Sequence, residues 1–101
     1  MTELRSIELH SSKVSDISAL SNKVNLKYLG LSYTQIRDLR PVATLSGLEK
    51  LNMRSCRYVS DLAPLANLKN LKELNIQHCD GITDLTPLES LPKLDVLKLP
   101  Q

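Results

Sequence analysis

Apolar residues recur along the chain in the pattern Leu-x-x-Leu-x-Leu, with spacings of 22, 22, 23 and 23 residues between successive copies. The copies are LRSIEL (4–9), LKYLGL (26–31), LEKLNM (48–53), LKELNI (71–76) and LDVLKL (94–99). Because side chains alternate along an extended segment, the fourth and sixth positions of each copy point to the same side. The pattern therefore predicts a short parallel strand in each copy, with these two side chains in a shared core.

A second block of shared positions follows each of the first four copies. It has a ladder position (Ser12, Thr34, Cys56, Cys79), an apolar residue (Val14, Ile36, Val59, Ile82), an Asp (Asp16, Asp38, Asp61, Asp84) and a pair of apolar residues three apart. In the later repeats a proline precedes the second apolar residue of that pair, at Pro41, Pro64 and Pro87. Proline suits the first helical turn, and a nearby carboxylate can accept the free N–H groups there. We expect a short capped helical or 3₁₀ turn on the outer face of each repeat.

These units define one domain over residues 1–101, with repeats at 4–25, 26–47, 48–70 and 71–93 and a partial repeat at 94–101. The third and fourth repeats carry one extra residue after the ladder position, which we place in a loop. A single repeat cannot bury its hydrophobic stripe alone, so neighbours must stack. The predicted fold class is α/β: a right-handed solenoid with a curved parallel sheet on its concave face and short 3₁₀ or helical turns on its convex face.

Three lines of the sequence, IRDLRPVATLSGLEKL, VSDLAPLANLKNLKEL and ITDLTPLESLPKLDVL, resemble a known family. They resemble the short class of leucine-rich repeat, as found in bacterial internalins and in a regulatory subunit of a eukaryotic Ser/Thr phosphatase. The segment CDGITDLTPL is also similar to cysteine-bearing repeats of trypanosomatid and some bacterial surface proteins. The resemblance extends over residues 4–99 and implies a scaffold that binds other proteins and carries no catalytic activity.

The composition agrees with a layered aliphatic core, because leucine supplies 21 residues while Phe and Trp are absent. Solenoids generally need polar caps over their end layers, and the sequence predicts none at either end. Three explanations stay open: excision from a longer array, a small protein with partly polar ends, or a homodimer through an uncapped end.

Charge and apolar patterning exclude several classes of partner. Thirteen basic and eleven acidic residues of mixed order leave a net charge of +2, which predicts neither nucleic acid nor an anionic membrane as a partner. No apolar run approaches the ~18 residues of a membrane span, and the N-terminus lacks the apolar segment of a secretory signal. Two cysteines, Cys56 and Cys79, are too few for a disulfide framework. We expect a cytoplasmic protein with both thiols reduced and buried.

Candidate chemistry is sparse. Gly30, Gly47 and Gly81 are isolated, so no phosphate-binding loop is predicted, and the four repeated Asp residues are explained by capping. His78 directly precedes Cys79, so the two should point to opposite faces and cannot share a metal ion. We therefore expect no catalytic residue, no metal site and no cofactor.

The outward side chains of the strands are the predicted binding site, because they are free to vary without harming the core. Tyr and Arg are the types most often found at interface hot spots, and Gly30 should leave a shallow notch beside Tyr28. An ordinary solvated sheet surface is the alternative. The candidate protein-binding residues are Tyr28, Tyr33, Lys50, Asn52, Arg54, Glu73, Asn75 and Gln77.

A second Arg/Tyr cluster is predicted in the loops, where Arg37 and Arg40 flank one helical turn and Arg57-Tyr58 fills the extra position of the third repeat. A solvated charged surface explains this cluster equally well. We hypothesise a non-enzymatic module that binds a partner protein through the concave sheet, with a small intracellular inhibitor or immunity-type protein as its more specific form. The alternative is a structural solenoid segment of a larger bacterial effector or surface protein.

Overall fold

The computed structural model describes residues 4–10 and 13–99, so the predicted ladder residue Ser12 lies outside the described part of the chain. Short strands form one parallel sheet in chain order: β1 (Ser6–Glu8), β2 (Tyr28–Gly30), β3 (Lys50–Asn52), β4 (Glu73–Asn75) and β5 (Val96–Lys98). The pairing register joins equivalent positions of successive repeats, for example Ile7 to Leu29 and Leu29 to Leu51. The repeat alignment made from the sequence is therefore the register of the sheet.

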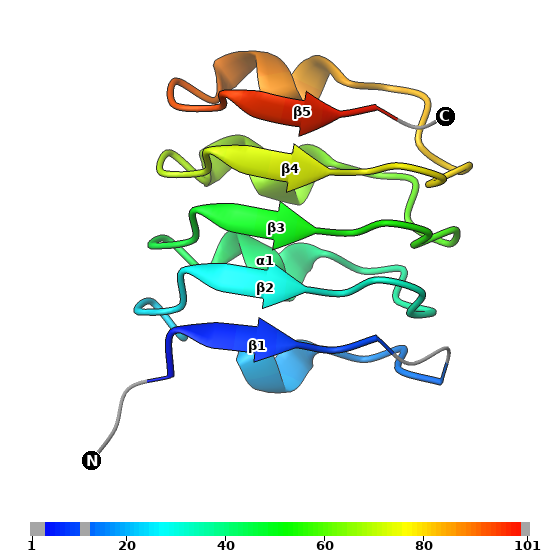
Figure 1. Ribbon diagram of the computed structural model, residues 1–101, viewed down its shortest axis with the longest axis horizontal. Helices are drawn as coiled ribbons and strands as arrows, with labels where there is room; N and C mark the ends of the chain where they lie inside the picture. The colour runs from blue at the N-terminus through cyan, green and yellow to red at the C-terminus, as the bar shows by residue number, and fades with distance from the viewer. Residues whose placement is uncertain (1–3, 11–12, 100–101) are drawn as a thin grey trace.

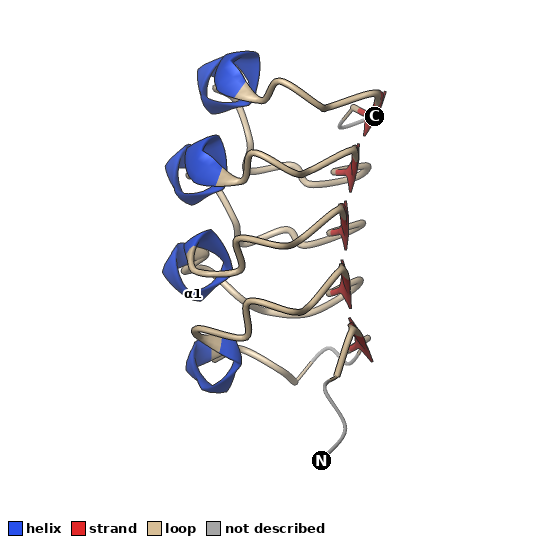
Figure 2. Ribbon diagram, turned by 90° about the vertical axis from the view of Figure 1, so that its left-hand side faces the viewer, coloured by secondary structure: helices blue, strands red, loops and turns tan. Residues whose placement is uncertain are grey.

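The chain rises from β1 to β5 as a right-handed coil, with each strand in front and each return segment behind it (Figure 1). Turned by a quarter circle, the molecule has two separate columns, one of strands and one of short helical turns (Figure 2). The strands stay almost in line over these repeats. The predicted solenoid with a parallel sheet on one face and helical turns on the other is confirmed.

Each return segment contains one short helical element: η1 (Ser18–Leu20), α1 (Arg40–Ala43), η2 (Ala63–Asn67) and η3 (Thr86–Ser90). Near the start of each of these elements, an Asp carboxylate accepts a hydrogen bond from the backbone N–H group two residues further along the chain. These bonds are 2.9 Å long at Asp16, Asp38, Asp61 and Asp84. These hydrogen bonds satisfy a backbone N–H group that would otherwise be unpaired at the start of each turn, as the sequence predicts.

The core consists of columns of aliphatic side chains that run through the stack. At the strand centres, Leu29, Leu51 and Leu74 are at most 2% exposed. At the two ends the same column loses its cover, since Ile7 is half-buried and Leu97 is 37% exposed. Stacking thus buries the interior repeats fully and leaves apolar surface on the outermost described layers.

In the second, third and fourth repeats, the ladder position buries one polar atom beneath the loop that follows the strand. Thr34 Oγ1 donates to the Leu31 carbonyl at 2.8 Å, and Cys56 Sγ donates to the same carbonyl at 2.9 Å. Cys79 Sγ repeats this contact on the Met53 carbonyl at 2.9 Å. Both cysteines are free and buried, which confirms the expectation of two buried thiols without a disulfide. Burial raises the pKa of both thiols, that of Cys79 to about 11.

Candidate functional site

The sheet face carries two rows of outward side chains, because the register places equivalent residues of the repeats beside one another. The first row is Ser6, Tyr28, Lys50, Glu73 and Val96, and the second is Glu8, Gly30, Asn52, Asn75 and Lys98. The helical turns all lie on the opposite side of the molecule (Figure 2). The two rows therefore face outward without any cover from the described part of the chain.

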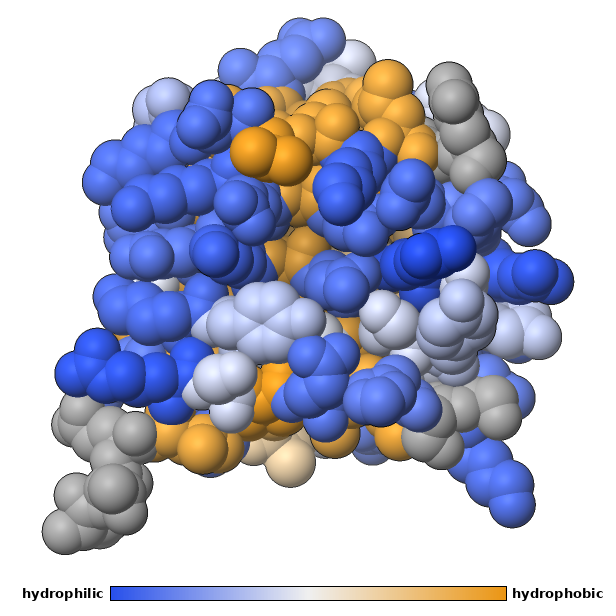
Figure 3. All heavy atoms as spheres, in the orientation of Figure 1, coloured by the Kyte–Doolittle hydropathy of each residue, from blue (hydrophilic) through white to orange (hydrophobic). Residues whose placement is uncertain are grey.

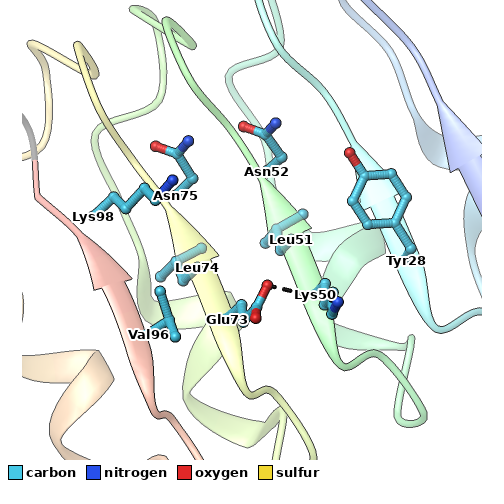
Figure 4. A pocket seen from close by; sticks show the side chains of 9 residues that line it. All are labelled: Tyr28, Lys50, Leu51, Asn52, Glu73, Leu74, Asn75, Val96 and Lys98. Carbon is cyan, nitrogen blue, oxygen red and sulfur yellow. Dashed lines mark ion pairs between the residues drawn. The ribbon is translucent and has the colours of Figure 1, made fainter.

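A shallow hollow, here called the sheet hollow, opens between these rows from β2 to β5 (Figure 4). Leu51 and Leu74 lie at its floor. Polar side chains of β2, β3 and β4 and the two outward residues of β5 surround it: Tyr28, Lys50, Asn52, Glu73, Asn75, Val96 and Lys98. The structure thus brings five of the eight candidate residues together around one depression.

The charges around the sheet hollow are partly paired. Lys50 Nζ lies 3.8 Å from Glu73 Oε2, and both side chains are about half exposed. An exposed ion pair of this kind contributes about 0.2–1 kcal/mol, so it is easily exchanged for contacts with a partner. Across the hollow, no described carboxylate forms an ion pair with Lys98. The site therefore offers one exchangeable ion pair and one cation.

Tyr28 is held in place from the neighbouring strand. Its hydroxyl donates to Glu8 Oε1 at 2.8 Å. Partial burial, together with the Glu8 carboxylate, raises the pKa of Tyr28. The expected notch at Gly30 is wrong, because a side chain added there would meet the Glu8 carboxylate. Gly30 leaves room for Glu8 rather than for a partner, and Glu8 in turn fixes the tyrosine ring.

The two asparagines are oriented by the backbone that follows them. Asn52 Oδ1 accepts the N–H group of Arg54 at 3.1 Å, and Asn75 Oδ1 accepts that of Gln77 at 2.9 Å. Each bond closes a local turn at the end of a strand, a use of Asn that is common where strands meet loops. The orientation of both side-chain amide groups at this edge of the sheet hollow is therefore fixed before any partner binds.

The other three candidate residues do not line the sheet hollow. Arg54 is exposed and Gln77 is half-buried, each beyond the end of its strand. Tyr33 instead lines a separate depression with Arg57 and Tyr58. Sequence reasoning left out Val96 and Lys98, although both stand in the aligned rows that would have included them.

The same face viewed as a surface is largely hydrophilic, with apolar surface emerging toward β5 (Figure 3). The exposed apolar residues there are Val96, Leu97 and Leu99. In the described part of the chain, no group of three or more His, Cys, Asp or Glu side chains is placed to hold a metal ion. The same residues contain no helix of the length and apolarity needed to cross a membrane.

Comparison with known proteins agrees with this geometry. A family model of leucine-rich repeats in two copies matches residues 24–67. The crystal structure of an internalin, inlF, from Listeria monocytogenes strain 4b F2365 is similar, with a TM-score of 0.80, 38% identity and 84% of this chain covered. Internalin C2, inlC2, of the same strain is similar with a TM-score of 0.75, 37% identity and 84% of this chain covered. The chain spans 25% of the first protein and 37% of the second. No curated protein sequence matches the chain.

Proposed function

Because the chain is a leucine-rich repeat protein, we propose that it is a non-enzymatic module that binds a partner protein through its sheet face. The observation that carries this proposal is the sheet hollow, where seven outward residues from four adjacent strands surround a floor of buried leucines. Tyr28 lies at one end of the hollow and Val96 at the other, so apolar and aromatic surface flanks a polar centre. Interfaces commonly combine such anchors with hydrogen-bonding groups.

The physical advantage of this surface is its rigidity. Each strand is paired to its neighbours, and the side chains on the reverse of the interior strands are fully buried. Tyr28 is fixed by Glu8, and the two asparagine amides are fixed by backbone N–H groups. When a partner binds here, the module itself loses little conformational freedom, and this low ordering cost favours affinity.

The more specific form of the proposal is an inhibitor or immunity-type protein that covers the active site of an enzyme. The mixed charges of Lys50, Glu73 and Lys98 suit a partner surface with both signs of charge. This form predicts that the captured partner is an enzyme and that its activity falls in proportion to complex formation.

The test is affinity capture by the wild-type chain and by variants, followed by measurement of binding to the captured protein. Tyr28→Ala with Lys50→Ala is expected to weaken binding at least about 30-fold, the usual effect of removing an interface hot spot. The matched control is Arg40→Ala, since Arg40 is exposed on the opposite side and its side-chain hydrogen bonds among the described residues go to Asp38. Equal binding by both variants, with unchanged circular dichroism, would refute the sheet face as the site.

A structural role within a longer array is the second candidate, supported by the exposed apolar residues of the outermost layers: Leu4, Val24, Val96, Leu97 and Leu99. The limited share of the internalins that this chain spans is consistent with it. Sedimentation velocity separates the outcomes: a monomer supports the independent module, concentration-dependent dimers support pairing through an end, and larger oligomers support a segment that needs neighbouring repeats.

A further inference from the structure

A second hollow, here called the loop-edge hollow, lies where the chain leaves β2 and β3 and turns toward the helical side. Its lining residues are Tyr33, Thr34, Gln35, Ser55, Arg57 and Tyr58. The two tyrosine side chains come from adjacent repeats and are 55% and 51% exposed. None of these residues lines the sheet hollow, so the two depressions are separate surfaces.

The one-residue insertion of the third repeat creates this hollow. The second repeat passes from Thr34 to Ile36 through Gln35 alone, whereas the third passes from Cys56 to Val59 through Arg57 and Tyr58. Both ends of the longer loop are anchored by buried side chains, Cys56 and Val59. The two side chains of this longer loop, Arg57 and Tyr58, are therefore directed to solvent by an anchored backbone.

The two tyrosines are positioned by different features, Tyr58 by a cation–π contact and Tyr33 by its backbone conformation. The Arg37 guanidinium lies 5.2 Å from the centre of the Tyr58 ring, a cation–π contact that positions both groups. Tyr33 has φ 63, a left-handed conformation that suits Gly or Asn better than a tyrosine. The same conformation recurs at the equivalent positions of the next two repeats, Ser55 and His78, both with φ 61, so it belongs to the repeat loop, and at this position the Tyr33 side chain is 55% exposed.

The positive charge at this edge is not neutralised within the described residues. No carboxylate there forms an ion pair with Arg37 or Arg57. Asp80, at the position of the fourth repeat that corresponds to Arg57, does not pair with it either. Some cations elsewhere are paired, as for Arg40 with Asp38 and for Lys27 and Lys72 with Glu49. The hollow thus combines the ring surfaces of Tyr33 and Tyr58 with the guanidinium of Arg57, and the Arg37 guanidinium lies beside it at the Tyr58 ring.

We propose that the loop-edge hollow binds an acidic segment of a partner protein, in which an apolar side chain enters between Tyr33 and Tyr58 while flanking carboxylates pair with Arg37 and Arg57. Arginine suits this role because its planar fork donates two parallel hydrogen bonds to a carboxylate. A peptide fits better than a nucleic acid, because the net charge of +2 and the mixed signs along the chain provide no extended basic track.

The experiment is a titration of the ¹⁵N-labelled chain with a soluble peptide that alternates Glu and Leu, followed by amide chemical shifts. The expected result is saturable shifts at Tyr33, Ser55, Arg57 and Tyr58, with affinity that falls as salt rises from about 50 to about 500 mM. A matched peptide with Gln in place of Glu should bind at least about tenfold more weakly, because it offers no carboxylates.

Variants locate the site. Arg37→Gln with Arg57→Gln should weaken binding of the acidic peptide about tenfold, the expected loss for two exposed ion pairs. Arg40→Gln with Lys69→Gln removes the same charge elsewhere and should leave the affinity within about twofold. Tyr33→Asn suits the left-handed backbone, so it keeps the fold while removing one ring, and it should weaken binding about threefold.

Three results would overturn the proposal: no shifts at these amides at saturating peptide, equal affinity for the Glu and Gln peptides, or stronger binding of an oligothymidylate at the same amides. The sheet-face variant Tyr28→Ala provides the link to the proposed function. It should leave the acidic peptide bound normally, so failure of one surface is distinguishable from failure of the other.

Discussion

Raising the pH should destabilise the fold through Cys79, a side chain with no part in either proposed binding surface. Its thiol is buried and donates to the Met53 carbonyl at 2.9 Å. Burial raises its pKa from 9.0 to about 11. Because the folded state keeps this proton longer than the unfolded chain does, the stabilisation is complete below pH 9 and is lost as the pH rises from 9 toward 11.

The size of the effect follows from the shift. Each pKa unit corresponds to about 1.4 kcal/mol, so at pH 10.5, about 1.5 units above the unfolded value, the loss attributable to Cys79 is about 2 kcal/mol. Cys79→Thr removes the titrating group and keeps a donor at the ladder position. Thr34 shows that a hydroxyl fits there, since its Oγ1 donates to the Leu31 carbonyl at 2.8 Å.

The assay is urea unfolding followed by circular dichroism in reducing buffer, for the wild type and for Cys79→Thr, at about pH 7.5 and about pH 10.5. The two proteins differ only at this position, so their comparison isolates the contribution of Cys79. We expect the wild type to lose about 2 kcal/mol more than the variant over this interval. Equal losses would show that the Cys79 thiol is not held protonated by burial.

Two further changes test the stacking and the caps. Leu51→Ala, at a side chain that is 2% exposed, should lower the free energy of unfolding by about 2–5 kcal/mol, as measured by urea unfolding. Leu97→Ala, at the equivalent position but 37% exposed, should lower it by less than half as much. Similar losses for the two variants would contradict an open end layer. The Asp84 carboxylate accepts hydrogen bonds from the N–H and hydroxyl groups of Thr86, which lowers the pKa of Asp84. Its contribution to stability is therefore present above pH 3.8 and is lost as the pH falls below that value. Asp84→Asn should reduce the dependence of the thermal unfolding temperature on pH in this acid range, and an unchanged dependence would refute the cap.

Sequence periodicity predicted the stack well, because every repeat places its leucines at the same offsets. Aligning Leu29, Leu51 and Leu74 by position gives the pairing register of the sheet directly. The Asp-before-proline pattern likewise predicted the helical turns, since both residue types act on the local backbone alone. The membership of the outward rows followed from the same alternation.

Contacts between side chains of different repeats were not predictable in this way. The Glu8 carboxylate occupies the space over Gly30 and binds Tyr28, which depends on the rotamers of two residues on neighbouring strands. Tyr33 stands next to the outward row in sequence, but its left-handed backbone belongs to a loop that turns away from the sheet hollow. The candidate set therefore divides between two surfaces that one-dimensional alignment had joined.

The measurement that decides most directly whether the sheet face is the binding surface is amide cross-saturation in the complex of the ²H,¹⁵N-labelled chain with its captured partner. Saturation transferred from the partner should concentrate on the amides of Tyr28, Lys50, Asn52, Glu73 and Asn75, which surround the sheet hollow. Transfer concentrated on α1, η2 and η3, or on the outermost layers, with none at these five amides, would contradict binding through the sheet.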